Sequence, residues 1–184
     1  MPTGVGELKP LTQDSINHVG VRWLPDGKRF VFCGNEPEHG LRLFVQSLTD
    51  SKPKAISPEG IGARFVLSPR GDVVAGMGAD RKVYLYPIEG GEPRPVPGIG
   101  ANEVPTGWSS DGRSLFVLRY GELPARVTQV DVATGQRKPW KDLVPADAAG
   151  IDTISGILMT PDAKAYVYSY VRTLSDLYLV EGLK

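Results

Sequence analysis

The stretch Trp108-Ser-Ser-Asp-Gly-Arg-Ser-Leu-Phe-Val-Leu118 joins a large aromatic residue, a tight turn and an apolar run, and this combination recurs along the chain. The turn returns as Trp23-Leu-Pro-Asp-Gly27, Leu67-Ser-Pro-Arg-Gly71 and Met159-Thr-Pro-Asp-Ala163, with intervals of 44, 41 and 51 residues between last positions. Pro presets the first corner of such a turn, Asp accepts backbone hydrogen bonds two residues on, and Gly tolerates positive φ. Four copies at this period are typical of the four-stranded blade of a β-propeller.

Three sets of predicted strands follow the turns. The first set is apolar and lies at 29–33, 73–77, 114–118 and 165–169; the second lies at 41–45, 82–86, 126–130 and 176–180; the third, basic and rich in proline, lies at 54–57, 94–97 and 138–141. The first set does not alternate, which predicts strands packed between neighbouring blades, whereas the second alternates as half-exposed strands do. Proline confines the third set to sheet edges, so we expect it to be the outermost strand of each blade.

The fourth repeat lacks this third strand, and an extra copy, Lys9–Thr12, stands near the start of the chain. Its distance to Trp23 is 11 residues, in register with the other repeats. We therefore expect residues 8–12 to form the outer strand of the last blade, beside 176–180, or of a preceding blade. The predicted architecture is a single all-β propeller-type domain over residues 1–184, with about four blades of four antiparallel strands. The blade repeats lie at about 13–57, 58–97, 98–141 and 151–184, and the one candidate for a helical turn lies within 142–151.

These repeats resemble the TolB-like, WD-repeat-like propeller family, whose repeat is an aromatic residue, Ser-Pro-Asp-Gly and an apolar strand. The resemblance runs from Leu8 to Lys184, although Arg70 replaces the Asp of the second turn and Ala163 replaces the Gly of the fourth. The ending Leu174–Leu183 is similar to the C-terminus of propellers appended to bacterial serine/threonine kinases and related sensor proteins. TolB-like propellers usually have six blades. The resemblance therefore implies a small closed ring, a fragment or half of a larger propeller with six to eight blades, or a homodimer with shared blades.

Composition excludes several classes of protein. Lys plus Arg and Asp plus Glu number 21 each, so the chain lacks the basic excess of a general nucleic-acid binder. No apolar run reaches 18 residues, which argues against membrane insertion. The single Cys33 excludes an internal disulfide and multi-cysteine metal sites, and we expect it in the core. Residues 1–10 have no signal-peptide pattern, which indicates the cytoplasm if Met1 is the native start and the periplasm if the chain belongs to a larger protein.

No group of residues predicts catalysis, a metal or a cofactor. The chain has no Gly-x-Ser-x-Gly elbow, no kinase motif and no P-loop, and Ser155 is interpreted as a small core residue. Only two histidines exist, and His39 lies with Glu36 and Glu38 in a segment that is better explained as a solvated loop than as a metal site. The repeated carboxylates are interpreted as turn formers at separate blades: Asp26, Asp111 and Asp162.

The mouth of the central channel is the usual functional surface of a propeller. The polar residues in or before the predicted innermost strands are His18, Arg22, Arg64, Glu103 and Asp152. Their mixed charge fits a peptide or a small polar ligand, and solvated rim residues without a partner are the alternative. The sequence thus predicts a non-catalytic domain for recognition or scaffolding that binds a protein, a peptide or a small polar ligand.

Two other functions compete with this one. The chain could be the sensory or substrate-gating propeller of a serine/threonine kinase or peptidase whose catalytic domain lies elsewhere. A ring-type enzyme such as a lactonase or glycosidase is the other alternative, but the few carboxylates and metal ligands near the channel argue against it. The repeat alignment further predicts that Trp23 and Trp108 are buried and equivalent, each anchoring one blade.

Overall fold

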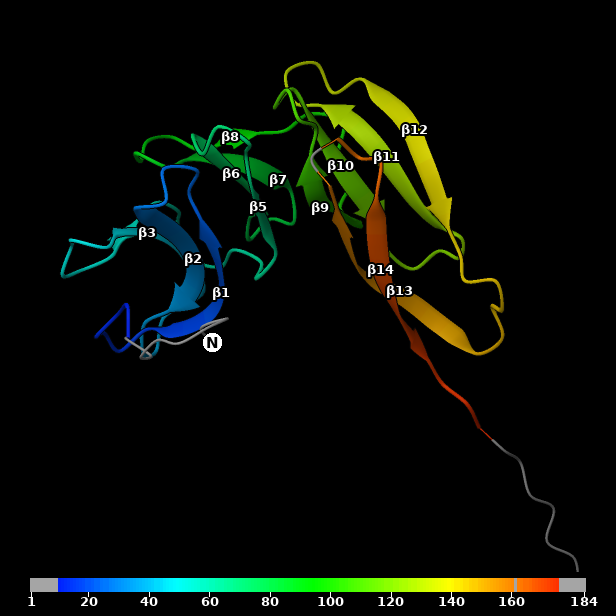
Figure 1. The fold of residues 1–184 in the computed structure, drawn as a ribbon, viewed down its shortest axis with the longest axis horizontal. Coiled ribbons are helices and arrows are strands. Elements are labelled where there is room, and N and C mark those ends of the chain that lie inside the picture. The colour runs from blue at the N-terminus through cyan, green and yellow to red at the C-terminus, as the bar shows by residue number, and fades with distance from the viewer. Residues whose placement is uncertain (1–9, 161, 176–184) are drawn as a thin grey trace, which may run out of the picture.

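The structure, a computed structural model, describes residues 10–160 and 162–175. Fourteen strands in this part of the chain form four antiparallel sheets, which follow one another along an open arc (Figure 1). Blade I holds β1 (Asn17–Trp23), β2 (Arg29–Asn35), β3 (Arg42–Ser47) and β4 (Lys54–Ala55). Blade II holds β5 (Phe65–Leu67), β6 (Val73–Met77), β7 (Val83–Pro87) and β8 (Arg94–Pro95). Blade III holds β9 (Glu103–Trp108), β10 (Ser114–Arg119), β11 (Ala125–Asp131) and β12 (Arg137–Leu143), and blade IV holds β13 (Ile151–Met159) and β14 (Tyr166–Arg172).

Each sheet keeps its strands in chain order, so every neighbouring pair is an antiparallel hairpin. The first strand of each blade lies on the concave side of the arc, and the short basic strands β4 and β8 lie at the outer edge, as their prolines and lysines predict (Figure 1). The all-β propeller-type fold expected from the repeats is confirmed. No helix occurs in the described residues, and none long and apolar enough to span a bilayer is found there.

The repeated turn has the chemistry that its sequence predicts. Asp26 Oδ1 accepts hydrogen bonds from the amides of Lys28 and Arg29 at 2.8 and 3.0 Å, and Asp111 and Asp162 accept the amide two residues on in the same way. A hydrogen bond from the Arg29 side chain lowers the pKa of Asp26 to about 2. The last position of all four turns has positive φ: Gly27 64°, Gly71 70°, Gly112 70° and Ala163 55°. Ala163 therefore holds a conformation that its Cβ disfavours.

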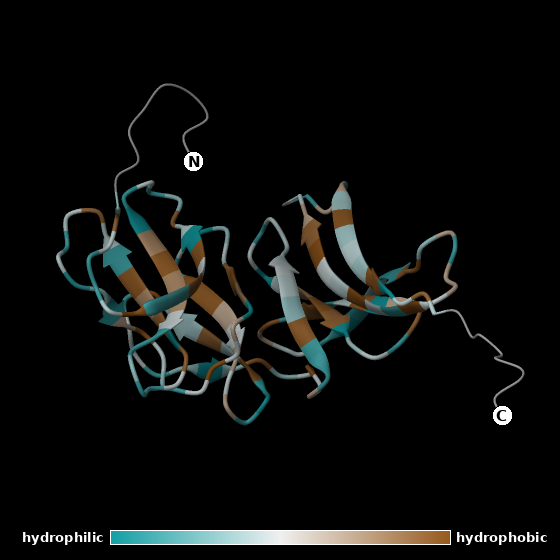
Figure 2. Ribbon diagram, turned by 90° about the horizontal axis from the view of Figure 1, so that it is seen from below, coloured by the Kyte–Doolittle hydropathy of each residue, from teal (hydrophilic) through white to brown (hydrophobic). Residues whose placement is uncertain are grey.

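Most of the core lies in the layers between successive blades, and Figure 2 shows the apolar bands along the middle of the strands. A further buried cluster, Phe30, Phe32 and Phe44, lies on the face of blade I that no described blade covers. Blade I packs on blade II through residues such as Val31, Cys33 and Val74. Blade II packs on blade III through Ala75, Trp108 and their neighbours. A third layer joins blades III and IV, where Phe116, Leu118, Tyr166 and Tyr168 are among the members. Both faces of the second strand are buried in β2, β6 and β10, which confirms the interpretation of the non-alternating runs in blades I to III. For the run at 165–169 the prediction is wrong, because Val167 of β14 is 64% exposed where no blade among the described residues covers it.

Two further predictions are corrected, and the alternative of a small closed ring does not hold for the described residues. Trp108 is 7% exposed, but Trp23 is 50% exposed, because no blade among the described residues precedes blade I to cover it. The four sheets do not close into a ring: apolar side chains remain exposed on β1 and on β14, at the two ends of the arc (Figure 1). The segment between β12 and β13 contains turns rather than a helical turn, and Gly150 has a φ of 68° there. The predicted pairing of Lys9–Thr12 with 176–180 falls largely outside the described residues and stays a prediction.

Candidate functional site

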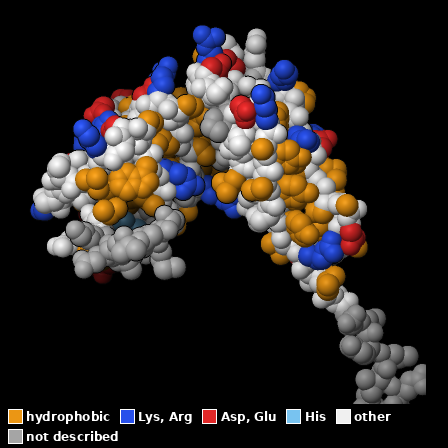
Figure 3. Space-filling model, viewed as in Figure 1, with side chains coloured by type: hydrophobic (Ala, Val, Ile, Leu, Met, Phe, Trp, Pro, Cys, Tyr) orange, Lys and Arg blue, Asp and Glu red, His pale blue; other side chains and the backbone are white. Residues whose placement is uncertain are grey.

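A hollow of about 560 Å³ lies on the concave side of the arc, where the innermost strands of all four blades converge. Gly20 of β1, Phe65 of β5, Thr106 of β9 and Ile157 of β13 each contribute to its wall, and β14 adds residues on one side. In Figure 3 basic side chains gather at this concavity, with apolar side chains on both arms of the arc. The hollow therefore corresponds to the part of the central channel that these four blades enclose.

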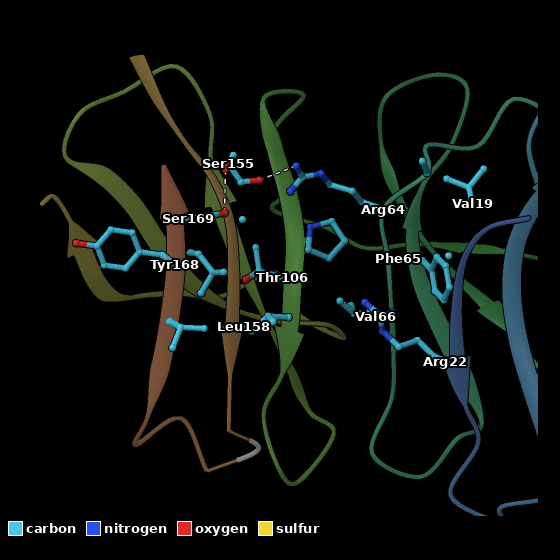
Figure 4. A pocket seen from close by; sticks show the side chains of 16 residues that line it. Val19, Arg22, Arg64, Phe65, Val66, Thr106, Ser155, Leu158, Tyr168 and Ser169 are labelled. Carbon is cyan, nitrogen blue, oxygen red and sulfur yellow. Dashed lines mark hydrogen bonds between the residues drawn. The ribbon is translucent and has the colours of Figure 1, made fainter. Parts of the chain in front are cut away.

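Two arginines from neighbouring blades reach into the hollow (Figure 4). Arg64, just before β5, donates from Nη2 to the carbonyl oxygen of Ser155 at 2.6 Å, so it crosses the hollow from blade II to blade IV. Its guanidinium carbon lies 5.3 Å from the centroid of the Tyr120 ring. Arg22 of β1 donates to the carbonyl oxygen of Val21 at 2.8 Å and lies 5.7 Å from the centroid of the Phe65 ring.

Neither arginine forms an ion pair with a carboxylate among the described residues, and no acidic side chain lines the hollow. Aromatic rings and carbonyl oxygens hold the two guanidinium groups in place but leave most of their donors without an anionic partner. Arg presents five N–H donors in a planar fork that matches carboxylates and phosphates. The electrostatic character of the hollow is therefore that of a site for an anion.

Hydroxyl groups and apolar walls complete the hollow. The Ser155 and Ser169 side-chain oxygens are 2.9 Å apart, on the facing strands β13 and β14 (Figure 4). Thr106 donates to the carbonyl oxygen of Phe116 at 3.1 Å, while Leu158 and Val167 form an apolar wall beside it. Ser155 is thus part of the wall of the hollow and not, as expected from the sequence, a small core residue. The lining offers hydrogen-bond donors next to apolar surface, as ligand sites commonly do.

The other three predicted channel-mouth residues are His18, Asp152 and Glu103. His18 stacks on the ring of Phe32 with centroids 4.2 Å apart, and its Nε2 is 3.0 Å from Asp14 Oδ1. Asp152 accepts a hydrogen bond from the hydroxyl of Thr173 near the end of β14. None of them is among the residues that line the hollow. The structure thus brings Arg22 and Arg64 together and separates them from the remaining candidates.

Glu103 is 3% exposed and lies in blade III, where Arg137 binds it through two hydrogen bonds of 2.6 and 2.8 Å. The Gly100 amide donates a third hydrogen bond at 2.9 Å. Burial acts to raise the pKa of Glu103, but the hydrogen bonds from Arg137 and Gly100 and the positive charge of Arg137 outweigh it, so the pKa lies below its ordinary value. Glu103 and Arg137 border a second, shallower hollow of about 550 Å³. Because the Glu103 carboxylate is paired with Arg137, it holds strands of blade III together and offers no free charge to a ligand.

Cys33 and His39, the residues considered for thiol chemistry and metal binding, are respectively buried in the core and paired with another side chain. Cys33 is fully buried, as predicted, and burial raises the pKa of its thiol to about 11. His39 lies in the same loop as Glu36 and Glu38, and its Nδ1 is 2.8 Å from Oε1 of Glu59, which lies outside that loop. Within residues 10–160 and 162–175 no three His, Cys, Asp or Glu side chains form a group suited to a metal ion.

Comparison with known proteins places this geometry among propellers. A putative TolB from Agrobacterium tumefaciens matches with a TM-score of 0.62 and 21% identity, over 86% of this chain and 55% of that one. TolB from Acinetobacter baumannii matches with a TM-score of 0.60 and 17% identity, over 88% and 45%. The fold is that of a TolB-like β-propeller. A nidogen/laminin complex, at 10% identity, and an oligogalacturonate lyase in complex with manganese, at 16% identity, match with TM-scores of 0.61 and 0.51.

This chain spans about half the length of these solved structures. No protein-family model matches its sequence, and no curated protein matches it either. These matches establish the fold, and the evidence on function comes from the residues that line the hollow.

Sequence reasoning did not single out Thr106, Ser155, Ser169 or Tyr168 as site residues. They come from three strands of two blades. A Ser, Thr or Tyr in a predicted strand does not by itself indicate a binding site. The signal that could have found Ser155 is its place in the innermost strand of blade IV, on the same side as the channel.

Proposed function

We propose that this TolB-like propeller chain is a non-catalytic recognition domain that binds a carboxylate-bearing ligand, an acidic peptide segment, in the hollow. The observation that carries the proposal is the pair Arg22 and Arg64, which reach into the hollow without an ionic partner among the described residues. A carboxylate placed between them would accept charge-assisted hydrogen bonds, which are stronger than neutral ones. The hydroxyls of Ser155, Ser169 and Thr106 supply further polar contacts for the ligand backbone.

An acidic peptide fits better than a nucleic acid because the positive charge is confined to two side chains in a concave site. Nucleic-acid affinity depends on a chain of phosphate contacts along an extended basic surface. The formal net charge of the chain is zero at pH 7. A carboxylate can also come from an acidic sugar, and one of the structural neighbours acts on oligogalacturonate, so the test includes a uronate arm.

The experiment measures binding of fluorescein-labelled pentaglutamate by fluorescence anisotropy, with pentaglutamine as the uncharged control and trigalacturonate as a competitor. We expect pentaglutamate to bind, and Arg64→Gln to weaken the binding about tenfold, the effect of losing one charge-assisted hydrogen bond of about 1.5 kcal/mol. Arg94→Gln is the matched control, because Arg94 lies on β8 at the outer edge of blade II.

Three outcomes would overturn the proposal: equal binding of the two peptides, equal losses in the Arg64 and Arg94 variants, or displacement of pentaglutamate by trigalacturonate at much lower concentration. The last would assign the hollow to an acidic sugar. The role as a sensory or substrate-gating propeller of a larger kinase or peptidase is the alternative kept from the sequence. The length of the natural reading frame distinguishes it from an independent recognition domain.

A further inference from the structure

The blades contact one another through positions fixed by the repeated turn. We define the front residues as the residue that opens the turn motif and the residue three positions after its end. The back residues are the one just before the motif and the one four positions after its end. In blade III the front residues are Trp108 and Leu115, and in blade II the back residues are Val66 and Ala75.

The contact between blades II and III shows how a front and a back fit together. Trp108 is 7% exposed, and its Nε1 donates to the carbonyl oxygen of Val66 at 3.2 Å. Leu115 and Ala75, both with no exposed surface, belong to the same apolar layer. The other two contacts follow the same rule: Val74 of the blade II front packs with Val31 of the blade I back, and Tyr166 of the blade IV front packs with Phe116 of the blade III back.

Blade I has a front with no blade against it. Its front residues are Trp23, which is 50% exposed, and Phe30, which is 2% exposed. Trp23 packs edge to face on the Phe30 ring, with centroids 5.6 Å apart, so the open area of this front is the surface of Trp23 itself. No described residue accepts a hydrogen bond from the Trp23 indole. His18 and Ile16 cover the outer part of this face, over Phe32 and Phe44. The part that stays open is the inner strand, where Val19 and Val21 are also half exposed.

Blade IV has a back with no blade against it. Its back residues are Leu158, 66% exposed, and Val167, 64% exposed, which lie opposite each other in the β13–β14 register. On the same face of the sheet, the neighbouring cross-strand pairs, Gly156 with Ser169 and Thr153 with Val171, carry no charge either. In the space-filling view apolar side chains run along this arm of the arc (Figure 3). Within the described residues blade IV presents only its two inner strands.

We propose that the open front of blade I docks onto the open back of blade IV of a second copy of this chain, in a two-fold dimer. Trp23 of each copy would occupy, over Leu158 and Val167 of the other, the place that Trp108 occupies over Val66 and Ala75. The two surfaces are the two halves of a contact that the chain already forms between its own blades.

A second copy is the occupant for two reasons. The described residues of each chain leave one open front and one open back, so a two-fold axis pairs each open front with an open back. Any unrelated partner would have to reproduce the shape of a propeller blade on one side.

The test is the mass of the chain in solution, measured by light scattering across a range of concentrations. We expect a mass twice the 19.9 kDa of one chain, which does not increase further with concentration. Trp23→Glu and Val167→Glu should each raise the dissociation constant about 100-fold or more, because each places an unpaired charge in both contacts of the dimer. Leu123→Glu, which changes an exposed leucine in the loop between β10 and β11 of blade III, away from both open faces, should leave the mass unchanged.

Mixing the two variants separates a specific contact from general damage. A heterodimer of the Trp23 and Val167 variants contains one contact with both changes and one contact with neither, so the mixture should regain dimers that neither variant forms alone. Circular dichroism of each variant shows that its fold is retained. A monomeric parent chain, a mass that keeps growing with concentration, or no recovery on mixing would each overturn the proposed dimer.

Discussion

Trp108 and Trp23 form a matched pair for testing the repeat, because they hold the same place in two turns and differ in what covers them. Replacing Trp108 by Ala removes a side chain that is 7% exposed, its contacts with the layer around Leu115, and the hydrogen bond to the Val66 carbonyl. A buried Trp covers about 200 Å² of surface, worth about 5 kcal/mol at 25 cal/mol per Å². Measured losses for such truncations are about 3–5 kcal/mol, and we expect a value in that range.

Trp23→Ala should cost much less in the monomer. Its side chain is 50% exposed, so about half of the transfer free energy applies and no closed cavity is created. We expect a loss of about 2 kcal/mol, roughly half of the value for Trp108. The packing of Trp23 on Phe30 accounts for most of this loss.

Urea denaturation followed by circular dichroism measures both losses without relying on tryptophan fluorescence. The protein concentration is kept low enough that association does not contribute. Trp108→Phe is a useful control, since it keeps an aromatic ring but removes the indole donor, for an expected loss of about 1–2 kcal/mol. Equal losses at positions 23 and 108, or a loss below about 1 kcal/mol at position 108, would refute the account of the blade contacts.

Four other outcomes are expected. Ala163→Gly should raise the free energy of unfolding by about 1 kcal/mol, because Ala163 has a φ of 55°, and an unchanged urea midpoint would contradict this. Glu103→Gln should lower stability by about 2 kcal/mol at pH 7. The folded chain lowers the pKa of Glu103, so this stabilisation is complete above the pKa of the unfolded glutamate and disappears as the pH falls through the folded value; acid denaturation of both chains checks the sign. Cys33 should react with iodoacetamide only at the rate of unfolding, and rapid labelling of the native chain would argue against its burial. The purified chain should hydrolyse neither esters nor ATP, with or without divalent metal, and turnover that persists through further purification would show otherwise.

The sequence predicted the features that depend on neighbouring residues in the chain. The role of Asp26 in its turn follows from local hydrogen bonding, and the outer position of Arg94–Pro95 follows from the missing proline donor. The burial of Val31 and Cys33 was predicted from an apolar run that does not alternate. These inferences needed no knowledge of how the blades are arranged.

The features that the sequence did not predict depend on which distant part of the chain packs against a given side chain. Trp23 and Trp108 have the same local sequence context, and only the presence of a preceding blade decides which one is buried. Glu103 looks like a free channel residue until the pairing of distant strands brings Arg137 to it. Ser155 was interpreted as a core residue because the turn pattern does not specify which way the channel side of β13 faces.

The hollow and the open ends of the arc are physically connected through Leu158 and Val167. Both residues line the hollow, and both form the open back of blade IV. A second copy docked there would exclude water from one wall of the hollow. Charge-assisted hydrogen bonds from Arg22 and Arg64 to a carboxylate are stronger where the local dielectric constant is lower. Ligand affinity and dimer affinity would then be coupled, and the coupling free energy would be the same in both directions. The arginine pair is thus expected to bind a carboxylate more tightly in the dimer than in the single chain.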